Sequence, residues 1–135
     1  YKRLGYLEAL KERGIEPGDC CLDDDRHGVI EDAVQNLIDS GGLPSAWFAA
    51  SDECAMRFAK VVRDNGLVIP DDVAVVGMDD VEPAAYMNPG LTSVHIPYQD
   101  AGAEAMEVLK RLIENPGAVS HRVVLRHRLV VRESC

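Results

Sequence analysis

The chain has 135 residues, enough for about one domain, and it is 47% hydrophobic and 27% charged, as globular proteins are. Its formal net charge of −9 argues against binding of nucleic acid through a basic face. The longest apolar runs, such as 46–50 and 73–76, are far shorter than the roughly 18–20 residues of a membrane-spanning helix. The composition therefore excludes a disordered or membrane-spanning chain.

Motifs of enzymes, cofactor sites and metal sites are missing from the sequence. It contains no Gly-x-Ser-x-Gly, no Walker-type glycine loop and no Gly-x-Gly-x-x-Gly, and its four histidines lack metal-ligand spacing. The cysteines, which also lack Cys-x-x-Cys spacing, are Cys20, Cys21, Cys54 and Cys135. We expect them to be small buried hydrophobic residues in a reducing cytoplasm. No enzyme, cofactor or metal is predicted.

Hydrophobic periodicity and turn residues divide the chain into alternating helices and strands. In chain order we expect a helix at 3–13, a strand at 19–22, a helix at 29–38, a strand at 46–50, a helix at 53–65, a strand at 73–80, a turn at 81–88, a strand at 92–96, a helix from 97 to about 114, and strands at 123–125 and 128–132. This order predicts an α/β fold with a Rossmann-like parallel sheet flanked by helices.

The strand at 73–80 is the most informative of these elements. Its β-branched run, Val73-Ala-Val-Val, is typical of a strand that is buried on both faces, and it ends in Asp79 and Asp80. Ligands of open α/β sheets bind outside the carboxyl ends of such strands. We therefore expect this strand to deliver Asp79 to a binding edge.

Carboxylates follow three of the predicted strands, at Asp23–Asp25, Asp52 and Asp79-Asp80. The carboxyl ends of parallel strands share one edge, so these groups are expected to lie along one rim. Asp25 and Asp80 are interpreted as capping or solvated residues, whereas Asp52 could cap its helix and also face the cleft. Such a rim suits the hydroxyls of a sugar or polyol, and a divalent cation is the competing ligand.

The helix at 53–65 has an apolar arc wider than its own core requires, which favours a second packing partner. The residues expected to point inward are Ala55, Phe58, Ala59 and Val62, and the residues that widen the arc are Cys54, Met56 and Val61.

Five segments of the chain resemble one protein family. They are Gly-Tyr-Leu-Glu-Ala-Leu (5–10), Ala-Ser-Asp-Glu-Cys-Ala (50–55), Leu-Val-Ile-Pro-Asp-Asp-Val-Ala-Val-Val-Gly-Met-Asp-Asp (67–80), Asn-Pro-Gly-Leu-Thr-Ser-Val (88–94) and Leu-Val-Val-Arg-Glu-Ser (129–134). Together, and in this order, they resemble the effector-binding region of LacI/GalR-family transcriptional regulators.

The resemblance implies a periplasmic-binding-protein-like type I fold, in which two α/β subdomains enclose the effector. Residues 1–91 would form the C-terminal effector-binding subdomain and 127–135 its return strand. Residues 92–126 would be crossover strands and a helix that belong to the N-terminal subdomain. The helix-turn-helix of such regulators would be absent from the chain, so operator DNA would be bound only through that missing part.

Family positions that contact the effector can be transferred to this sequence one at a time. Asp79 matches an aspartate that bonds ligand hydroxyls, and Ser51-Asp52 stands where Asn-Asp is usual. Lys2 stands where an arginine commonly clamps the effector, although a lysine lacks the bidentate fork, and Arg3 could substitute. Asp23 falls near the position of an aromatic residue that stacks on the ligand ring.

The resemblance also implies a homodimer, because the family dimerises through the helix at 53–65 and the segment after the Asp-Asp strand. The expected two-fold interface consists of Ala55, Met56, Ala59, Pro83, Ala84 and Met87.

The sequence is therefore interpreted as the effector-sensing and dimerisation domain of a cytoplasmic LacI-type regulator that binds a sugar or sugar derivative. The first alternative is a solute-binding protein of a sugar transport system, which shares the fold. The second is a phosphoacceptor receiver domain with Asp52 as acceptor, but no lysine stands at a late strand end, where that domain needs one.

Overall fold

The computed structural model describes residues 2–17, 28–119 and 121–135. Its elements are α1 (Lys2–Glu12), α2 (Val29–Asp39), β1 (Ala46–Phe48), α3 (Asp52–Asp64), β2 (Ala74–Asp79), α4 (Glu82–Ala85), β3 (Thr92–His95), α5 (Tyr98–Glu114) and β4 (Arg128–Val130). The predicted strand at 19–22, with Cys20, Cys21, Asp23 and Asp25, lies outside the described residues.

The described strands form one sheet in the order β1-β2-β3-β4. β1 pairs parallel with β2, and β2 pairs parallel with β3, so that Asp79 lies opposite His95. β4 returns antiparallel to β3 and pairs His95 with Arg128. The predicted α/β fold with a parallel sheet is confirmed, with one antiparallel strand at its edge.

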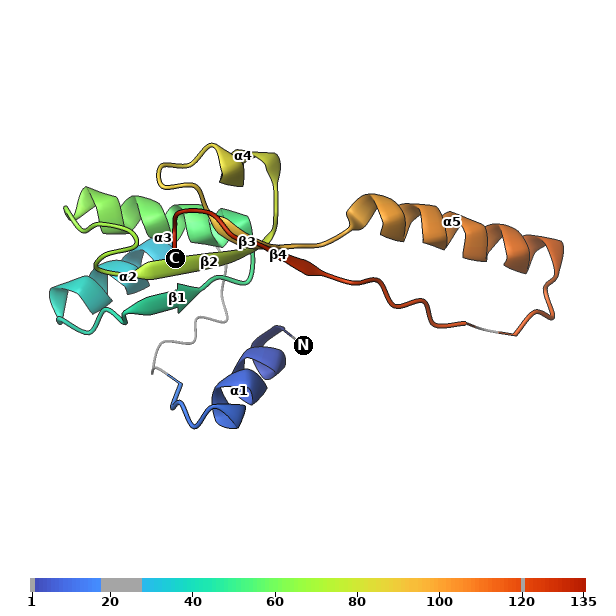
Figure 1. Ribbon diagram of the computed structural model, residues 1–135, viewed down its shortest axis with the longest axis horizontal. Helices are drawn as coiled ribbons and strands as arrows, with labels where there is room; N and C mark the ends of the chain where they lie inside the picture. Colours follow the sequence, from blue (N-terminus) through green and yellow to red (C-terminus); the bar gives the residue numbers. More distant parts are fainter. Residues whose placement is uncertain (1, 18–27, 120) are drawn as a thin grey trace.

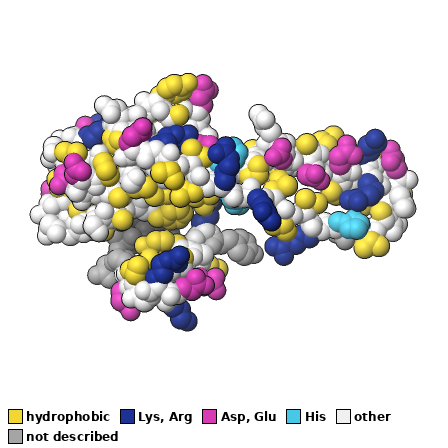
Figure 2. All heavy atoms as spheres, viewed as in Figure 1, with side chains coloured by type: hydrophobic (Ala, Val, Ile, Leu, Met, Phe, Trp, Pro, Cys, Tyr) yellow, Lys and Arg dark blue, Asp and Glu magenta, His cyan; other side chains and the backbone are white. Residues whose placement is uncertain are grey.

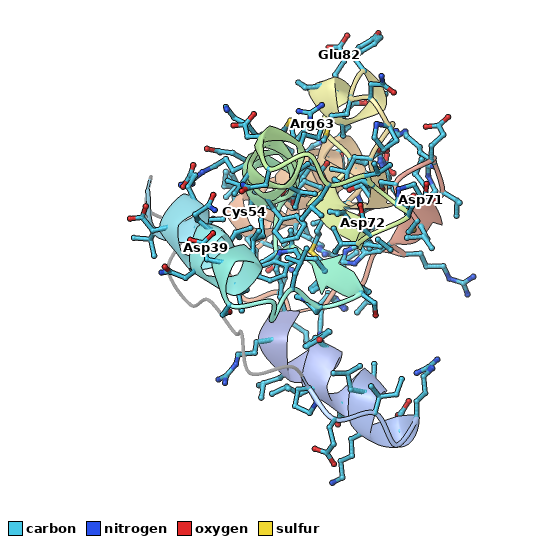
Figure 3. The ribbon with its side chains drawn as sticks, turned by 90° about the vertical axis from the view of Figure 1, so that its left-hand side faces the viewer. Asp39, Cys54, Arg63, Asp71, Asp72 and Glu82 are labelled. Atoms are coloured by element: carbon cyan, nitrogen blue, oxygen red, sulfur yellow. The ribbon has the colours of Figure 1, made fainter. Side chains whose placement is uncertain are left out.

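Helices cover the two faces of the sheet unequally (Figures 1 and 3). Successive side chains of a strand point to opposite faces, and β1 shows this directly. Trp47 stacks on Phe58 of α3 with ring centroids 4.4 Å apart, whereas Phe48 stacks on Tyr6 of α1 at 5.8 Å. Helices α2 and α3 therefore lie on the face of Trp47, and α1 lies on the face of Phe48.

The core lies between α3 and the sheet. Phe58 and Val62 are fully buried against Val73, Val75 and Leu91, and Ala55 and Ala59 are buried beside them. The inward face predicted for this helix is thus confirmed. Burying a side chain as large as Phe58 contributes up to about 3 kcal/mol, so this helix anchors the sheet.

β2 is buried on one face only, which corrects the expectation of a strand covered on both faces. Val75 and Gly77 are buried, but Val76 and Met78 are half-exposed. Val75 pairs with Trp47 and shares the α3 side, whereas Val76 pairs with Phe48 and shares the α1 side. Because α1 has no buried residue, it covers its side loosely.

Residues 96–127, hereafter the arm, extend away from the rest of the chain, hereafter the body (Figure 1). Helix α5 has no buried residue, and Met106 and Ile113 are 63% and 70% exposed. Figure 2 shows apolar side chains along the arm. The strand expected at 123–125 does not form, because this segment pairs with no strand among the described residues. No described helix is both long and apolar enough to span a membrane.

The residues after β4 close the body from the far end of the sequence. The buried hydroxyl of Ser134 accepts a hydrogen bond from Thr92 N at 2.8 Å and donates one to Val75 O at 2.6 Å. The Val75 N–H donates in turn to Ser134 O at 2.8 Å. This segment therefore satisfies backbone groups of β2 and β3 that no neighbouring strand reaches.

Candidate functional site

A hollow of about 350 Å³ lies at the carboxyl ends of β2 and β3, where the arm leaves the body. Its lining consists of Asp79, Asp80, Val81, His95, Ile96, Pro97, Tyr98, Gln99 and Asp100. Basic and histidine side chains gather at the same junction (Figure 2). The hollow thus stands at the edge of the sheet where the strand-end carboxylates were expected.

Asp79 lies on this hollow, at the last position of β2. Its φ of 114° is rare for a residue with a side chain and stores backbone strain, which is most often found at functional positions. The hydroxyl of Tyr98, the first residue of α5, donates to Asp79 Oδ1 at 2.7 Å. This hydrogen bond raises the pKa of the Tyr98 phenol. The strand delivers Asp79 to the edge as predicted, and its contact with a ligand stays a prediction.

Asp52 is fully buried and bonds within the chain rather than facing the hollow. Its Oδ1 accepts from Ser93 Oγ at 2.6 Å, and its Oδ2 accepts from Val81 N at 2.8 Å. Ser93 Oγ accepts in turn from Asp80 N at 3.1 Å. The Asp52 carboxylate thus links the start of α3 to β3 and to the turn after β2, and it fixes the backbone on both sides of Asp80.

Gly77 is the residue that makes room for this carboxylate. A Cβ atom at position 77 would lie 2.2 Å from Asp52 Oδ1 and 3.0 Å from Leu91 Cδ2, which no real side chain tolerates. The glycine in Val-Val-Gly-Met-Asp-Asp is therefore required by close packing.

Asp80 is an ion-paired residue, which corrects its interpretation as a capping or solvated one. Its Oδ1 accepts from Arg132 at 2.7 Å, and its Oδ2 lies 2.9 Å from His95 Nδ1. Burial alone would raise the pKa of Asp80, but the hydrogen bonds and charges of Arg132 and His95 outweigh it and hold that pKa below its usual value. Arg132 also donates to Leu91 O at 2.6 Å. The cluster ties β2, β3 and the return segment together where the arm begins.

The other predicted ligand residues lie at the end of β1 or outside the described chain. Ser51 is the N-cap of α3, since its hydroxyl accepts from Cys54 N at 3.2 Å. Lys2 Nζ donates to Ala50 O at 2.6 Å, which places its ammonium group beside Ser51. Arg3 is exposed on α1, and Asp23 lies outside the described residues. Lys2 and Ser51 thus meet at the end of β1, whereas Asp79 lies at the end of β2.

Sequence reasoning missed Tyr98, Ser93, His95 and Arg132. Tyr98 and His95 flank the expected boundary between the strand at 92–96 and the following helix, so their nearness to a strand end was the available signal. The hydrogen-bond partners of Ser93 and Arg132 are 41 and 52 residues away in the sequence, and no local pattern identifies them. In the described parts of the chain, no group of three or more His, Cys, Asp and Glu side chains could hold a metal ion, so the alternative of a cation site gains no support.

Three of the residues expected at a dimer interface belong to the core of the single chain. Ala55, Ala59 and Ala84 are 0–1% exposed, so they cannot present surface to a second copy. The second partner of α3 is instead α2 of the same chain, to which Arg57 binds by a hydrogen-bonded ion pair with Glu31 at 2.9 Å. This pair lowers the pKa of Glu31 to about 2.

The remaining interface candidates are Met56, Pro83 and Met87, which keep some exposed surface. Figure 3 shows Arg63 of α3 and Glu82 of α4 on the same upper side of the body, so the two helices that carry Met56 and Pro83 lie on one side.

The sequence from residue 3 to residue 135 matches the family of periplasmic binding protein-like domains. The chain belongs to this family. The match covers both the body and the arm.

The relatives of this periplasmic binding protein-like domain are transcriptional regulators. It is 33% identical over 98% of its length to catabolite control protein A of Priestia megaterium and 35% identical over 96% to the ribose operon repressor of Haemophilus influenzae. A solved CelR–cellobiose complex superposes with a TM-score of 0.86, at 35% identity over 97% of this chain and 41% of that one. The resemblance to LacI-family regulators is thereby confirmed.

The domain spans about two fifths of its relatives, covering 41% of catabolite control protein A and 40% of the ribose operon repressor. These relatives are regulators and not enzymes, and they do not favour the alternative of a transport protein.

Proposed function

We propose that this domain senses a small sugar or sugar derivative on behalf of a LacI-type transcriptional regulator. Two similar proteins support a sugar-like ligand, because one is named a ribose operon repressor and the other was solved with cellobiose. The domain would act as a sensor without chemistry of its own, in a cytoplasmic protein that needs no cofactor.

The observation that carries this proposal is the position of Asp79. An ionised carboxylate only accepts hydrogen bonds, so it selects ligands that present hydroxyl or amino hydrogens. Asp79 lines a hollow of about 350 Å³, within the size range of small-molecule sites. Its strained backbone is followed by a turn that Asp52 holds through Val81 N, which helps to keep the carboxylate preorganised.

The place of the hollow suggests how binding would be transmitted. The hollow is lined by residues from the body, such as Asp79, and by residues of the arm from Ile96 to Asp100. A ligand that binds one arrangement of body and arm more tightly than another shifts the population toward it. The regulator would thus respond through the angle at which its two lobes meet.

The partners of the whole protein belong to the same proposal. Operator DNA would be bound by a helix-turn-helix outside this chain, since a net charge of −9 does not favour contact with phosphates. A homodimer would place two helix-turn-helix parts on DNA. Met56 of α3, with Pro83 and Met87 from the segment after β2, would be the partly exposed surface for its two-fold contact.

The proposal is tested by replacing Asp79 with asparagine in the full-length regulator. The amide keeps the shape but loses the charge, so affinity for the effector should fall at least tenfold, since hydrogen bonds to charged groups contribute roughly 1.5–3 kcal/mol. Isothermal titration with D-ribose, cellobiose and related sugars would measure the loss, and operator binding without sugar should stay unchanged.

Asp71→Asn is the matched control. Asp71 is exposed in the loop that leads into β2, at the other end of that strand from Asp79. Its substitution should leave sugar binding intact. An Asp79→Asn protein that binds sugar as tightly as the Asp71→Asn protein would remove Asp79 from the site.

A further inference from the structure

The hydrogen bond between Tyr98 and Asp79 is the contact from which we infer more. Asp79 ends β2 in the body, and Tyr98 begins α5 in the arm. The phenol donates to Asp79 Oδ1 at 2.7 Å, an ordinary length for a bond from a hydroxyl to a carboxylate. The Asp79 carboxylate, which is proposed to accept a hydrogen bond from a ligand hydroxyl, therefore already accepts one from the hydroxyl of Tyr98.

Apart from this hydrogen bond, few contacts in the described structure fix the Tyr98 side chain. It is 59% exposed, and within the described residues its only side-chain hydrogen bond is the one to Asp79. Its backbone N–H donates to Ile96 O at 2.8 Å, a bond within the arm that does not involve the side chain, so the ring can rotate away without breaking it. Release of the phenol would expose little buried apolar surface and would cost mainly this one bond.

We propose that the Tyr98 hydroxyl occupies the place of a ligand hydroxyl at Asp79, and that the effector must displace it in order to bind. This inference rests on the proposed function, because it assumes that Asp79 receives a hydroxylated ligand. The exchange is balanced, since one O–H···O⁻ bond breaks as another forms and the phenol turns to solvent. Tyr98 is then a positioning residue that raises the effector concentration needed for binding.

Displacement also changes what joins the arm to the body. At their junction, Asp80 holds Arg132 and His95 by bonds of 2.7 and 2.9 Å, so the base of the arm stays attached when the effector enters. The Tyr98 bond is the additional link between the end of β2 and the first turn of α5. Loss of that link alone frees α5 to change its angle, which couples ligand entry to the arrangement of the lobes.

The test is Tyr98→Phe in the full-length regulator, which removes the hydroxyl and keeps the ring. Affinity for whichever of D-ribose and cellobiose binds should rise about fivefold, which corresponds to about 1 kcal/mol, the centre of the usual range for one hydrogen bond. In an Asp79→Asn background the same substitution should change affinity by less than about twofold. Tyr86→Phe, at a tyrosine that is 79% exposed and outside the hollow, is the control and should have no effect.

The bond itself is tested without a ligand by titrating the phenols through their ultraviolet absorbance. The difference between wild type and Tyr98→Phe should show a phenol that titrates above its ordinary pKa of 10.0, and Asp79→Asn should bring that value back down. This measurement stays informative whether or not a given sugar binds.

The outcomes separate this inference from the function on which it rests. Unchanged or weaker sugar binding by Tyr98→Phe, together with a loss in Asp79→Asn, overturns displacement and leaves the sensor function standing. Binding by Tyr98→Phe but not by wild type supports displacement strongly. Failure of both proteins to bind any of the sugars overturns both.

Discussion

Replacing Gly77 with alanine should destabilise the body through Asp52. The added Cβ would lie 2.2 Å from Asp52 Oδ1, so the carboxylate must move and lose its bonds to Ser93 and Val81. Overpacking costs roughly 1–3 kcal/mol, and buried groups left without partners cost about as much again. The smaller conformational freedom of the unfolded alanine chain offsets about 0.4–1 kcal/mol. We expect a net loss of about 3 kcal/mol.

Urea unfolding followed by the fluorescence of Trp47 would measure this loss. Trp47 is the single tryptophan of the chain and stacks on Phe58 in the core, so its emission reports on the body. The midpoint should fall by about 2 M for an unfolding slope of roughly 1.5 kcal/mol/M. Gly102→Ala is the control, because nothing lies within 4 Å of a Cβ there and the change should be neutral or slightly stabilising.

A double-mutant cycle would show whether Asp52 is the cause. In an Asp52→Ala background the alanine at position 77 no longer meets the carboxylate, so its cost should shrink to that of the contact with Leu91 at 3.0 Å. Additive losses from Gly77→Ala and Asp52→Ala, or a Gly77→Ala protein within about 0.5 kcal/mol of wild type, would refute the steric argument.

Two further predictions concern the junction and the end of the body. Ser134→Ala should cost about 2 kcal/mol in the same urea assay, because it leaves the buried Thr92 N–H without a partner, and a loss below about 0.5 kcal/mol would contradict this. Asp80→Asn should be less stable than wild type at neutral pH. Because folding lowers the pKa of Asp80 below 3.8, the wild-type advantage is complete above that pH and should shrink as pH falls below it; an advantage that grows in acid would contradict the ion pair.

Much of the fold was predictable because it depends on local patterns. The apolar spacing of Phe58 and Val62 identified the inner face of α3, and the β-branched run at 73–76 identified β2. The strand expected at 123–125 failed because a strand needs a pairing partner, and an apolar pattern cannot say whether one is present.

The site was predictable only in part, because its bonds join distant segments. Asp79 could be placed at the sheet edge by counting from the end of an apolar run. The burial of Asp52 depends on Gly77 and on Ser93, which lies 41 residues further on. The wide apolar arc of α3 was interpreted as the surface for a second copy, but α2 of the same chain packs against this helix. Ala55 and Ala59 are buried in the core and are unavailable to another copy.

The closure of the body by Ser134 has a consequence for synthesis on the ribosome. Ser134 follows its partner Val75 by 59 residues and its partner Thr92 by 42. At the usual synthesis rate of 5–20 residues per second, Ser134 would be made about 3–12 s after Val75, the β2 residue whose backbone groups it binds. During that interval the Val75 N–H and C=O groups lack the partners that Ser134 later supplies, and they can bond to other nascent chains. Translation speed through the codons for the arm should therefore influence how much of the protein reaches its folded state.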